Sequence, residues 1–223
     1  MNNSLYIVAY PSKPNFAEAW PIGAEHDYDN FVSCPLCGER VSGALWKRPR
    51  EVVLTSRKVP DFLYAYCDNV PFVISQNAIG KIQEAGLKGI TVAEEIETVR
   101  FQRKSKTETP IPKYYHVELA RSRITINHEK SNIVYQPSAS GKSCQLCRQV
   151  PAMYNFFRKL ILNTDCYEGY DIFHIYEMGN TVFLSQKFVD FYKESGLTNL
   201  HFNPAETHDQ QSVSYFLGDN EDA

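Results

Sequence analysis

The 223-residue sequence has no apolar run that approaches the roughly 20 residues a membrane-spanning helix needs. Its first residues, MNNSLYIVAYPSK, lack the positive charge and the long apolar stretch of a secretory signal. An excess of positive charge is also missing, since the formal net charge is −3, and this disfavours a generally basic nucleic-acid-binding protein. We therefore expect a cytoplasmic protein with no membrane partner, and we disfavour nucleic acid as its partner.

Complete catalytic motifs are missing as well. The segment SASGKS (138–143) ends like a phosphate-binding loop, but the chain lacks the earlier glycine that this loop requires. His116 and Glu118 could serve as an acid and a base, and Asp61 and Asp171 could form a carboxylate pair, yet no nucleophile motif accompanies them. For the two aspartates, a turn that begins a strand is the simpler explanation. We expect a protein that is not an enzyme.

Cysteine is present in a pattern that points to a metal. Four of the six cysteines form two CxxC pairs, namely Cys34 with Cys37 and Cys144 with Cys147. In a reducing compartment such pairs serve as metal ligands or free thiols more often than as structural disulfides. Four thiolates from two short turns match a closed, structural Zn²⁺ site. The alternatives are redox-active or free thiols, and two separate metal sites. Cys67 and Cys166 are expected to be buried or spare thiols.

The offset of 110 residues between the two CxxC pairs also relates longer segments. Residues 34–92 align with 144–202 without a gap, and 11 of the 59 positions are identical, about three times the chance level. Residues 71–92 and 181–202 each predict a buried strand, an amphipathic helix and a second short strand. The expected helix N-caps are Ser75 and Ser185, and the expected left-handed residues after the helices are Gly86 and Gly196.

This repeat predicts an α+β fold in one domain spanning residues 1–223. Two related halves, about 30–95 and 140–205, would pack about a pseudo-two-fold axis, where the CxxC turns meet as a Cys₄ zinc knuckle pair. Residues 96–139 contain KYYHVELA, RITIN and NIVYQ and are expected to form a central insertion of antiparallel strands. Residues 11–32 are expected to be a loop, and residues 206–223, which lack Lys and Arg, an acidic tail.

The segments CPLCG and CQLC, together with ISQNAIGKIQEAGLKGI and LSQKFVDFYKESGLTNL, resemble the double-CXXCG motif family of bacterial immunity proteins. The resemblance covers about residues 30–205 and departs at Arg148, where the family motif has glycine. It implies an immunity protein that binds and neutralises a cognate toxin, a secreted effector of the same locus used in bacterial competition. The zinc would then be structural.

Two other functions remain open from the residues themselves. A zinc-stabilised module that binds nucleic acid or protein is one alternative, and the basic run RFQRKSK (100–106) would suit it. A CxxC thiol oxidoreductase is the other.

Overall fold

The computed structural model describes most of the chain. The described residues are 4–9, 17–23, 26–27, 31–43, 45–55, 58–65, 70–102, 110–135, 144–147, 154–156 and 159–207. Several features singled out in the sequence lie outside them, namely Cys67, Arg148, the SASGKS segment, residues 103–106 of the basic run and residues 208–223 of the acidic tail. None of the helices in the described ranges has the length and apolar character needed to cross a bilayer.

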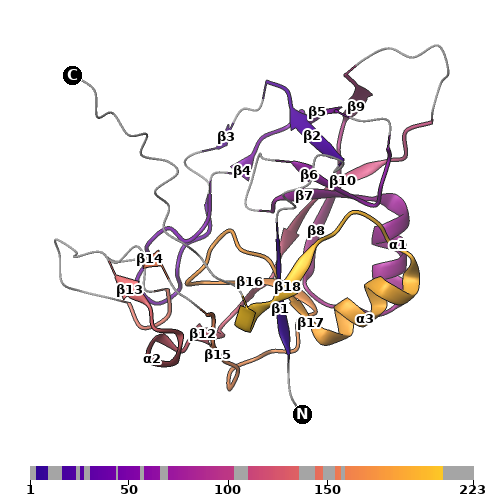
Figure 1. Cartoon of the computed structure of the whole chain (residues 1–223). Coiled ribbons are helices and arrows are strands. Elements are labelled where there is room, and N and C mark those ends of the chain that lie inside the picture. The colour runs from indigo at the N-terminus through magenta and orange to yellow at the C-terminus, as the bar shows by residue number, and fades with distance from the viewer. Residues whose placement is uncertain are drawn as a thin grey trace, which may run out of the picture.

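The fold is mostly β-sheet with a few helices, which confirms the expected α+β class (Figure 1). The largest sheet has the order β8-β10-β7-β6-β2-β5-β9. Its strands are β2 (Glu18–Pro21), β5 (Glu51–Leu54), β6 (Phe62–Ala65), β7 (Phe72–Ser75), β8 (Ile90–Glu95), β9 (Thr98–Phe101) and β10 (Tyr114–Leu119). A second sheet has the order β11-β16-β17-β1-β18. Its strands are β1 (Leu5–Val8), β11 (Arg121–Ser122), β16 (Ile172–Ile175), β17 (Phe183–Ser185) and β18 (Phe202–Pro204).

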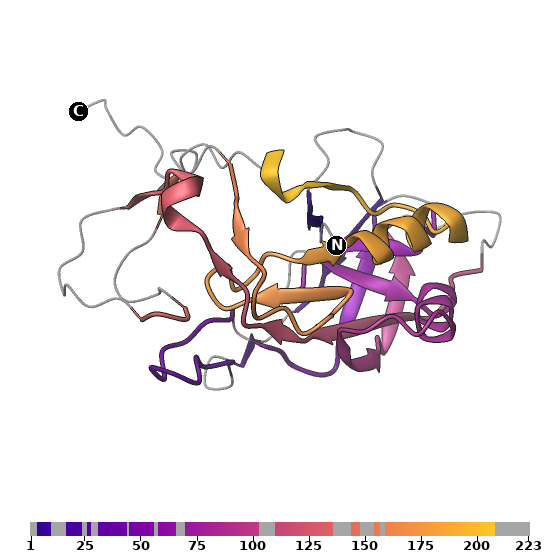
Figure 2. The same cartoon turned by 90° about the horizontal axis from the view of Figure 1, so that it is seen from below.

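Short strand pairs and helices complete the fold. The pairs are β3 (His26–Asp27) with β4 (Leu45–Trp46), β12 (Thr125–Ile126) with β15 (Leu162–Asn163), and β13 (Val134–Tyr135) with β14 (Tyr154–Phe156). The helices are α1 (Gln76–Glu84), α2 (His128–Ser131), α3 (Gln186–Ser195) and the 3₁₀ helix η1 (Ala205–Thr207). Figure 2 shows α2 at one end of the molecule and α1 and α3 at the other.

The two ends of the seven-stranded sheet are joined by the chain itself. β8 and β9 stand at opposite ends of the strand order, yet only Ile96 and Glu97 separate them in sequence. The backbone N–H of Ile96 donates to Tyr114 O in β10, whereas that of Thr98 donates to Arg50 O beside β5. The sheet therefore closes on itself as a small barrel.

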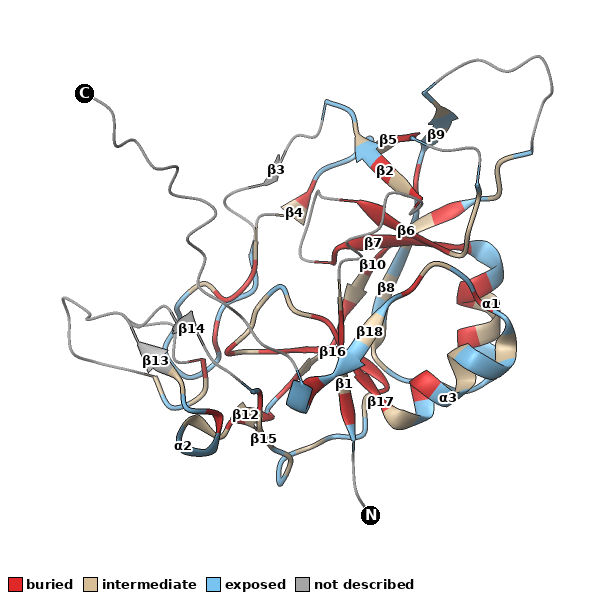
Figure 3. Cartoon of the chain, in the orientation of Figure 1, coloured by how far each residue is buried: buried red, intermediate tan, exposed pale blue. Residues whose placement is uncertain are grey.

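The two faces of the barrel wall contribute to two different cores. Leu63 and Val73 point inward and pack with Trp46 in the barrel interior. Phe62 and Ile74 point outward and pack against α1, α3 and the second sheet. Because β6 and β7 are buried on both faces (Figure 3), every position in FLYA and FVIS is buried.

The expected helix boundaries are confirmed. The side-chain oxygens of Ser75 and Ser185 accept hydrogen bonds from the backbone N–H groups three residues later, each at 3.1 Å. Gly86 and Gly196 follow the two helices with φ of 62° and 68°. Each helix buries one apolar face in the core that the helices share with both sheets.

Asp61 and Asp171 have equivalent structural roles. Each directly precedes a strand, as the simpler explanation predicted, and each accepts a hydrogen bond from the N-cap serine of the following helix. The oxygen distances are 2.9 Å from Ser75 to Asp61 and 2.8 Å from Ser185 to Asp171. Each aspartate thus connects the first strand to the helix within a unit of two strands, a helix and a third strand. We name these the first unit (61–95) and the second unit (171–204).

The second carboxylate oxygen of each aspartate reaches the opposite unit. Asp61 Oδ2 accepts from the backbone N–H of Thr198 at 3.1 Å, and Asp171 Oδ2 accepts from that of Lys88 at 2.9 Å. Lys88 and Thr198 are themselves 110 positions apart. The contacts between the two units are therefore reciprocal.

The residue after each of these donors is also in close contact with the opposite unit. Gly89 lies against Ile172, where a Cβ would come within 1.7 Å of the carbonyl oxygen. At the equivalent position Asn199, with φ 72°, donates its side-chain N–H to Phe62 O at 2.6 Å. Only glycine leaves room for the first of these contacts.

Strands from 96–139 do not form a sheet of their own. β10 pairs with β7 and β8, β9 pairs in parallel with β5, and β12 pairs with β15. A separate central insertion of antiparallel strands is therefore not confirmed. Residues 11–32, expected as a loop, contain β2 and β3, because β2 is held between β5 and β6.

Charged groups hold the corner where β8 passes into β9. The Arg50 backbone N–H donates to Glu97 at 2.8 Å, and its guanidinium donates to Glu94 at 2.5 Å and to Trp46 O at 3.1 Å. Arg48 forms ion pairs with both glutamates at 3.1 and 3.4 Å. The hydrogen bond from Arg50, aided by the charge of Arg48 and opposed by burial, lowers the pKa of Glu94.

Gly89→Ala is expected to lower the free energy of unfolding by about 2 kcal/mol or more, because of the close carbonyl and a φ of +130°. Gly80→Ala is the matched control. Gly80 lies in α1, and a Cβ there would meet no atom within 4 Å outside the helix backbone. Gly80→Ala should therefore raise the free energy of unfolding by about 0.5–1 kcal/mol. Urea-induced unfolding measures both, and an unchanged midpoint for Gly89→Ala contradicts the close approach.

Glu94→Gln is expected to lower the free energy of unfolding at pH 7 by roughly 1 kcal/mol, a small effect because the pair is partly exposed. A carboxylate with a lowered folded-state pKa contributes stability above its unfolded pKa and loses it as the pH falls through the folded value. The difference in the free energy of unfolding between variant and wild type should therefore become smaller below about pH 4. The free energies of unfolding of both proteins at pH 7 and pH 3 test this prediction. The same difference between the two proteins at both pH values contradicts it.

Candidate metal centre

The first knuckle (33–40) is a tight turn closed by backbone hydrogen bonds. Ser33 and Arg40 form an isolated β-bridge across its base. The Cys34 N–H donates to Glu39 O at 2.8 Å, and the Gly38 N–H donates back to Cys34 O at 2.9 Å. Gly38 has φ 78°, a conformation that glycine adopts without strain. This geometry brings both cysteines of the pair to the same side of the turn.

The second knuckle (144–147) is also a turn. The Leu146 N–H donates to the Cys144 sulfur at 3.4 Å, a contact typical of a thiolate held by a backbone turn. Cys147 is buried, and Cys144 is partly buried.

The four sulfurs form one cluster and lie within 4.8 Å of one another. Cys34 faces Cys144 at 3.8 Å, and Cys37 faces Cys147 at 3.5 Å. In each facing pair the two cysteines are 110 positions apart in sequence, the offset that separates the two CxxC pairs. Tetrahedral zinc with Zn–S bonds of about 2.3 Å separates its sulfurs by about 3.8 Å. The cluster can therefore hold a metal ion.

The residues that directly follow the first knuckle are packed against the second unit. A Cβ at Gly179 would lie 1.8 Å from the carbonyl oxygen of Val41, so glycine is required at this contact. The Gly43 N–H donates to the Asn180 side chain at 3.3 Å, and Arg121 donates to Gly179 O at 2.9 Å. The sulfur cluster thus lies close to where this segment and the second unit are also joined by backbone and side-chain contacts.

The pKa values of two thiols in the cluster are shifted in opposite directions. The backbone hydrogen bond with Glu39 lowers the pKa of Cys37, but burial and the Cys144 and Cys34 thiols outweigh it, so that this pKa is raised. Burial raises the pKa of the Cys144 thiol, but backbone N–H groups of Cys147 and Leu146 and the neighbouring thiols outweigh it and lower the pKa to about 7. A thiolate is the form that binds metal. Apolar contacts from Val41, Leu146 and Tyr176 cover one side of the cluster.

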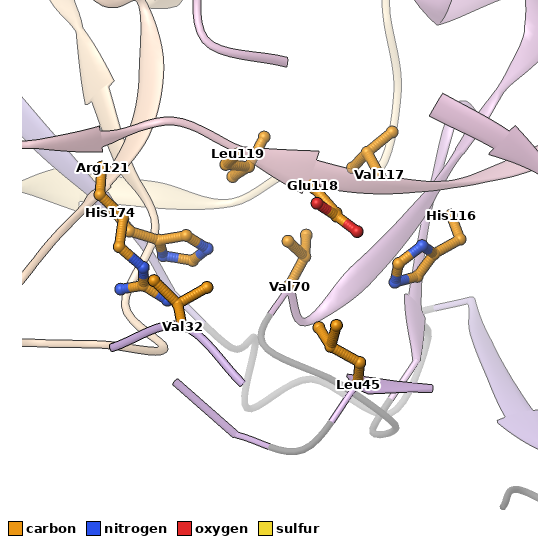
Figure 4. A pocket seen from close by; sticks show the side chains of 9 residues that line it. All are labelled: Val32, Leu45, Val70, His116, Val117, Glu118, Leu119, Arg121 and His174. Atoms are coloured by element: carbon orange, nitrogen blue, oxygen red, sulfur yellow. The ribbon is translucent and has the colours of Figure 1, made fainter. Parts of the chain in front are cut away.

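Other residues singled out in the sequence have different environments. Cys166 is an exposed free thiol. His116 and Glu118 line the same pocket on β10, together with two residues that sequence reasoning missed, Arg121 and His174 (Figure 4). No motif signals Arg121 and His174, because a register shift in β10 and the pairing of β11 with β16 bring them there.

Comparison with known proteins adds one match. The model of the immunity protein family Imm11 matches residues 93–207, slightly more than half of the chain. The matched region contains Cys144 and Cys147 and the second unit, whereas Cys34 and Cys37 precede it. A search of curated proteins finds no match.

Proposed function

Because the chain belongs to the Imm11 immunity protein family, we propose that it binds and neutralises a cognate protein toxin. The match over residues 93–207 carries this proposal and confirms the resemblance to bacterial immunity proteins. The toxin would be a secreted effector of the same locus, and the neutralising complex would form in the cytoplasm of the protected cell. Such a protein needs a rigid, complementary surface and no catalytic residues.

One structural Zn²⁺ ion bound by Cys34, Cys37, Cys144 and Cys147 is the second part of the proposal. The sulfur separations of 3.5 and 3.8 Å support it, since they are close to those of a zinc tetrahedron. Four thiolates leave no open position for water, so the ion would hold the surface in shape rather than catalyse.

The two units are proposed to derive from duplication of an ancestral half. The supporting observations are the reciprocal bonds of Asp61 and Asp171 and the facing cysteines, all related by the same offset of 110. The halves, about 30–95 and 140–205, would then form one domain of residues 1–223 about a pseudo-two-fold axis. The zinc would bridge the halves at that axis.

The acidic tail is proposed to assist toxin capture. Residues 206–223 contain five acidic residues and no Lys or Arg. A toxin that acts on nucleic acid carries a basic active site, toward which such a tail would steer the immunity protein.

Co-expression with the toxin gene of the same locus is expected to restore growth of a toxin-sensitive host, and the purified proteins should elute together in size-exclusion chromatography. A chain that neither restores growth nor forms a complex contradicts the immunity proposal. Strongly salt-dependent nucleic acid binding by the chain alone would instead support the binding module, and reduction of insulin disulfides would support the oxidoreductase.

Elemental analysis of the purified protein is expected to find about one zinc ion per chain. Cys34→Ser and Cys144→Ser should each lose the metal and lower the free energy of unfolding by several kcal/mol, because each removes a ligand from a closed site. Cys166→Ser is the matched control, since this exposed thiol lies outside the cluster, and it should keep metal and stability. If the two ligand variants also keep both, the Cys₄ proposal is wrong.

A further inference from the structure

The four sulfurs of the cluster differ in how far solvent reaches them. Cys37 is exposed and Cys144 is partly buried, whereas Cys34 and Cys147 are only 2% and 1% exposed. Leu36, the neighbour of Cys37, is 62% exposed, so this part of the first knuckle projects into solvent. Because the oxidation of a cysteine follows its exposure and its thiolate character, a dissolved oxidant meets Cys37 first.

Each sulfur faces a sulfur of the other knuckle. The Sγ atoms of Cys37 and Cys147 are 3.5 Å apart, those of Cys34 and Cys144 are 3.8 Å apart, and in each pair either sulfur can donate to the other. Disulfide formation brings two sulfurs to about 2.05 Å, so the shorter contact has to close by about 1.5 Å. An exposed thiol beside a second cysteine that can resolve its oxidised form is typical of redox-responsive pairs.

The first knuckle keeps its shape through backbone hydrogen bonds. The Ser33–Arg40 bridge closes its base, and the hydrogen bonds between Cys34 and Glu39 and between Gly38 and Cys34 hold the turn. Both of its cysteines therefore stay directed at the second knuckle when one of them is oxidised. This favours bonds between the knuckles over a bond within one CxxC motif.

We propose that the cluster is an oxidation site for peroxides, at which the disulfides Cys37–Cys147 and Cys34–Cys144 replace the zinc ion. This inference rests on the zinc site of the proposed function. It differs from an oxidoreductase, in which the disulfide forms within a CxxC motif and is passed to a substrate.

The chemistry needs only the peroxide and the four cysteines. Zinc holds its cysteine ligands as thiolates, so Cys37 attacks hydrogen peroxide without first losing a proton. An S–O bond forms, the O–O bond breaks, hydroxide leaves, and the sulfur becomes a sulfenic acid. The Cys147 thiolate then attacks the Cys37 sulfur, which forms the disulfide and releases a second hydroxide. A second peroxide oxidises Cys34 and Cys144 in the same way, and the ion, without its ligands, leaves as Zn²⁺.

The two disulfides would hold the junction that the zinc holds. Each would join residues that are 110 positions apart, and a bond that closes a long loop restricts the unfolded chain strongly. The knuckles would therefore stay together when a peroxide removes the ion. An immunity protein built in this way would keep its toxin-binding surface in shape through oxidative stress.

Peptide mapping of the zinc-loaded protein after peroxide treatment tests the pairing. Trypsin leaves Cys34 and Cys37 in the peptide 1–40 and Cys144 and Cys147 in the peptide 143–148. Mass spectra without reductant should show these two peptides joined, and a reductant should separate them. Chymotrypsin, which cleaves after Leu36 and Leu146, should then show Cys37 joined to Cys147. A disulfide within each peptide, Cys37 joined to Cys144, or sulfinic acids in place of disulfides overturn the proposal.

Zinc release measured with thiol loss checks the stoichiometry. Two equivalents of peroxide should release about one zinc ion and consume the four cluster thiols of each chain. Cys166→Ser is the matched control, because it removes an exposed thiol outside the cluster, and it should form the same link. A link that is lost in Cys166→Ser overturns the role of Cys37 as the first thiol oxidised. Protein purified without zinc contradicts the metal site of the proposed function, and the peptide link still decides the pairing.

Urea-induced unfolding tests whether the disulfides hold the junction. The oxidised, zinc-free protein should have a midpoint about 1 M or more above that of the reduced, zinc-free protein, because each bond restrains a long loop of the unfolded chain. An equal or lower midpoint overturns this part of the proposal.

Discussion

The reciprocal hydrogen bonds of Asp61 and Asp171 connect the N-cap of one helix to the backbone that follows the other. Each carboxylate uses one oxygen within its own unit and the second oxygen across to the opposite unit. Neither unit can shift without breaking charge-assisted bonds in both, and such bonds are among the stronger ones in proteins. The shared core of both helices and both sheets is built around this exchange.

The sulfur cluster depends on that arrangement. Cysteines that are 110 positions apart face each other across the cluster, and the same offset separates the aspartates that make the reciprocal contacts. Gly179 lets Val41, which follows the first knuckle, lie directly on the second unit, so the cluster joins segments that are already in contact. A metal bound there would strengthen an existing junction. Val32, which directly precedes the first knuckle, lies in the wall of the pocket beside β10.

Local signals were sufficient to predict the ends of α1 and α3. Ser75 and Ser185, and the glycines that follow the helices, have strong intrinsic preferences for the conformations they adopt. The clustering of the cysteines was expected from the two CxxC motifs and their shared offset, together with the preference of zinc for four thiolates. β2 could not be found this way, because its residues EAWP have weak strand preference and pair only where β5 and β6 provide partners. The barrel closure and the role of Arg121 depend on contacts between distant segments, for which one sequence carries no periodic signal.

The position of β1 has a consequence for how the chain acquires its fold. Leu5–Val8 pair with β17 on one side and β18 on the other, so an amino-terminal strand completes a sheet whose other members come mainly from the last third of the chain. Leu5 can pair with β17 only after Ser185 has been synthesised. At ribosomal speeds of about 5–20 residues per second, that delay lasts roughly 10–40 seconds, during which an apolar segment has no sheet to join. Contacts between residues this far apart in sequence slow folding. The second sheet of the newly made protein is therefore expected to form late.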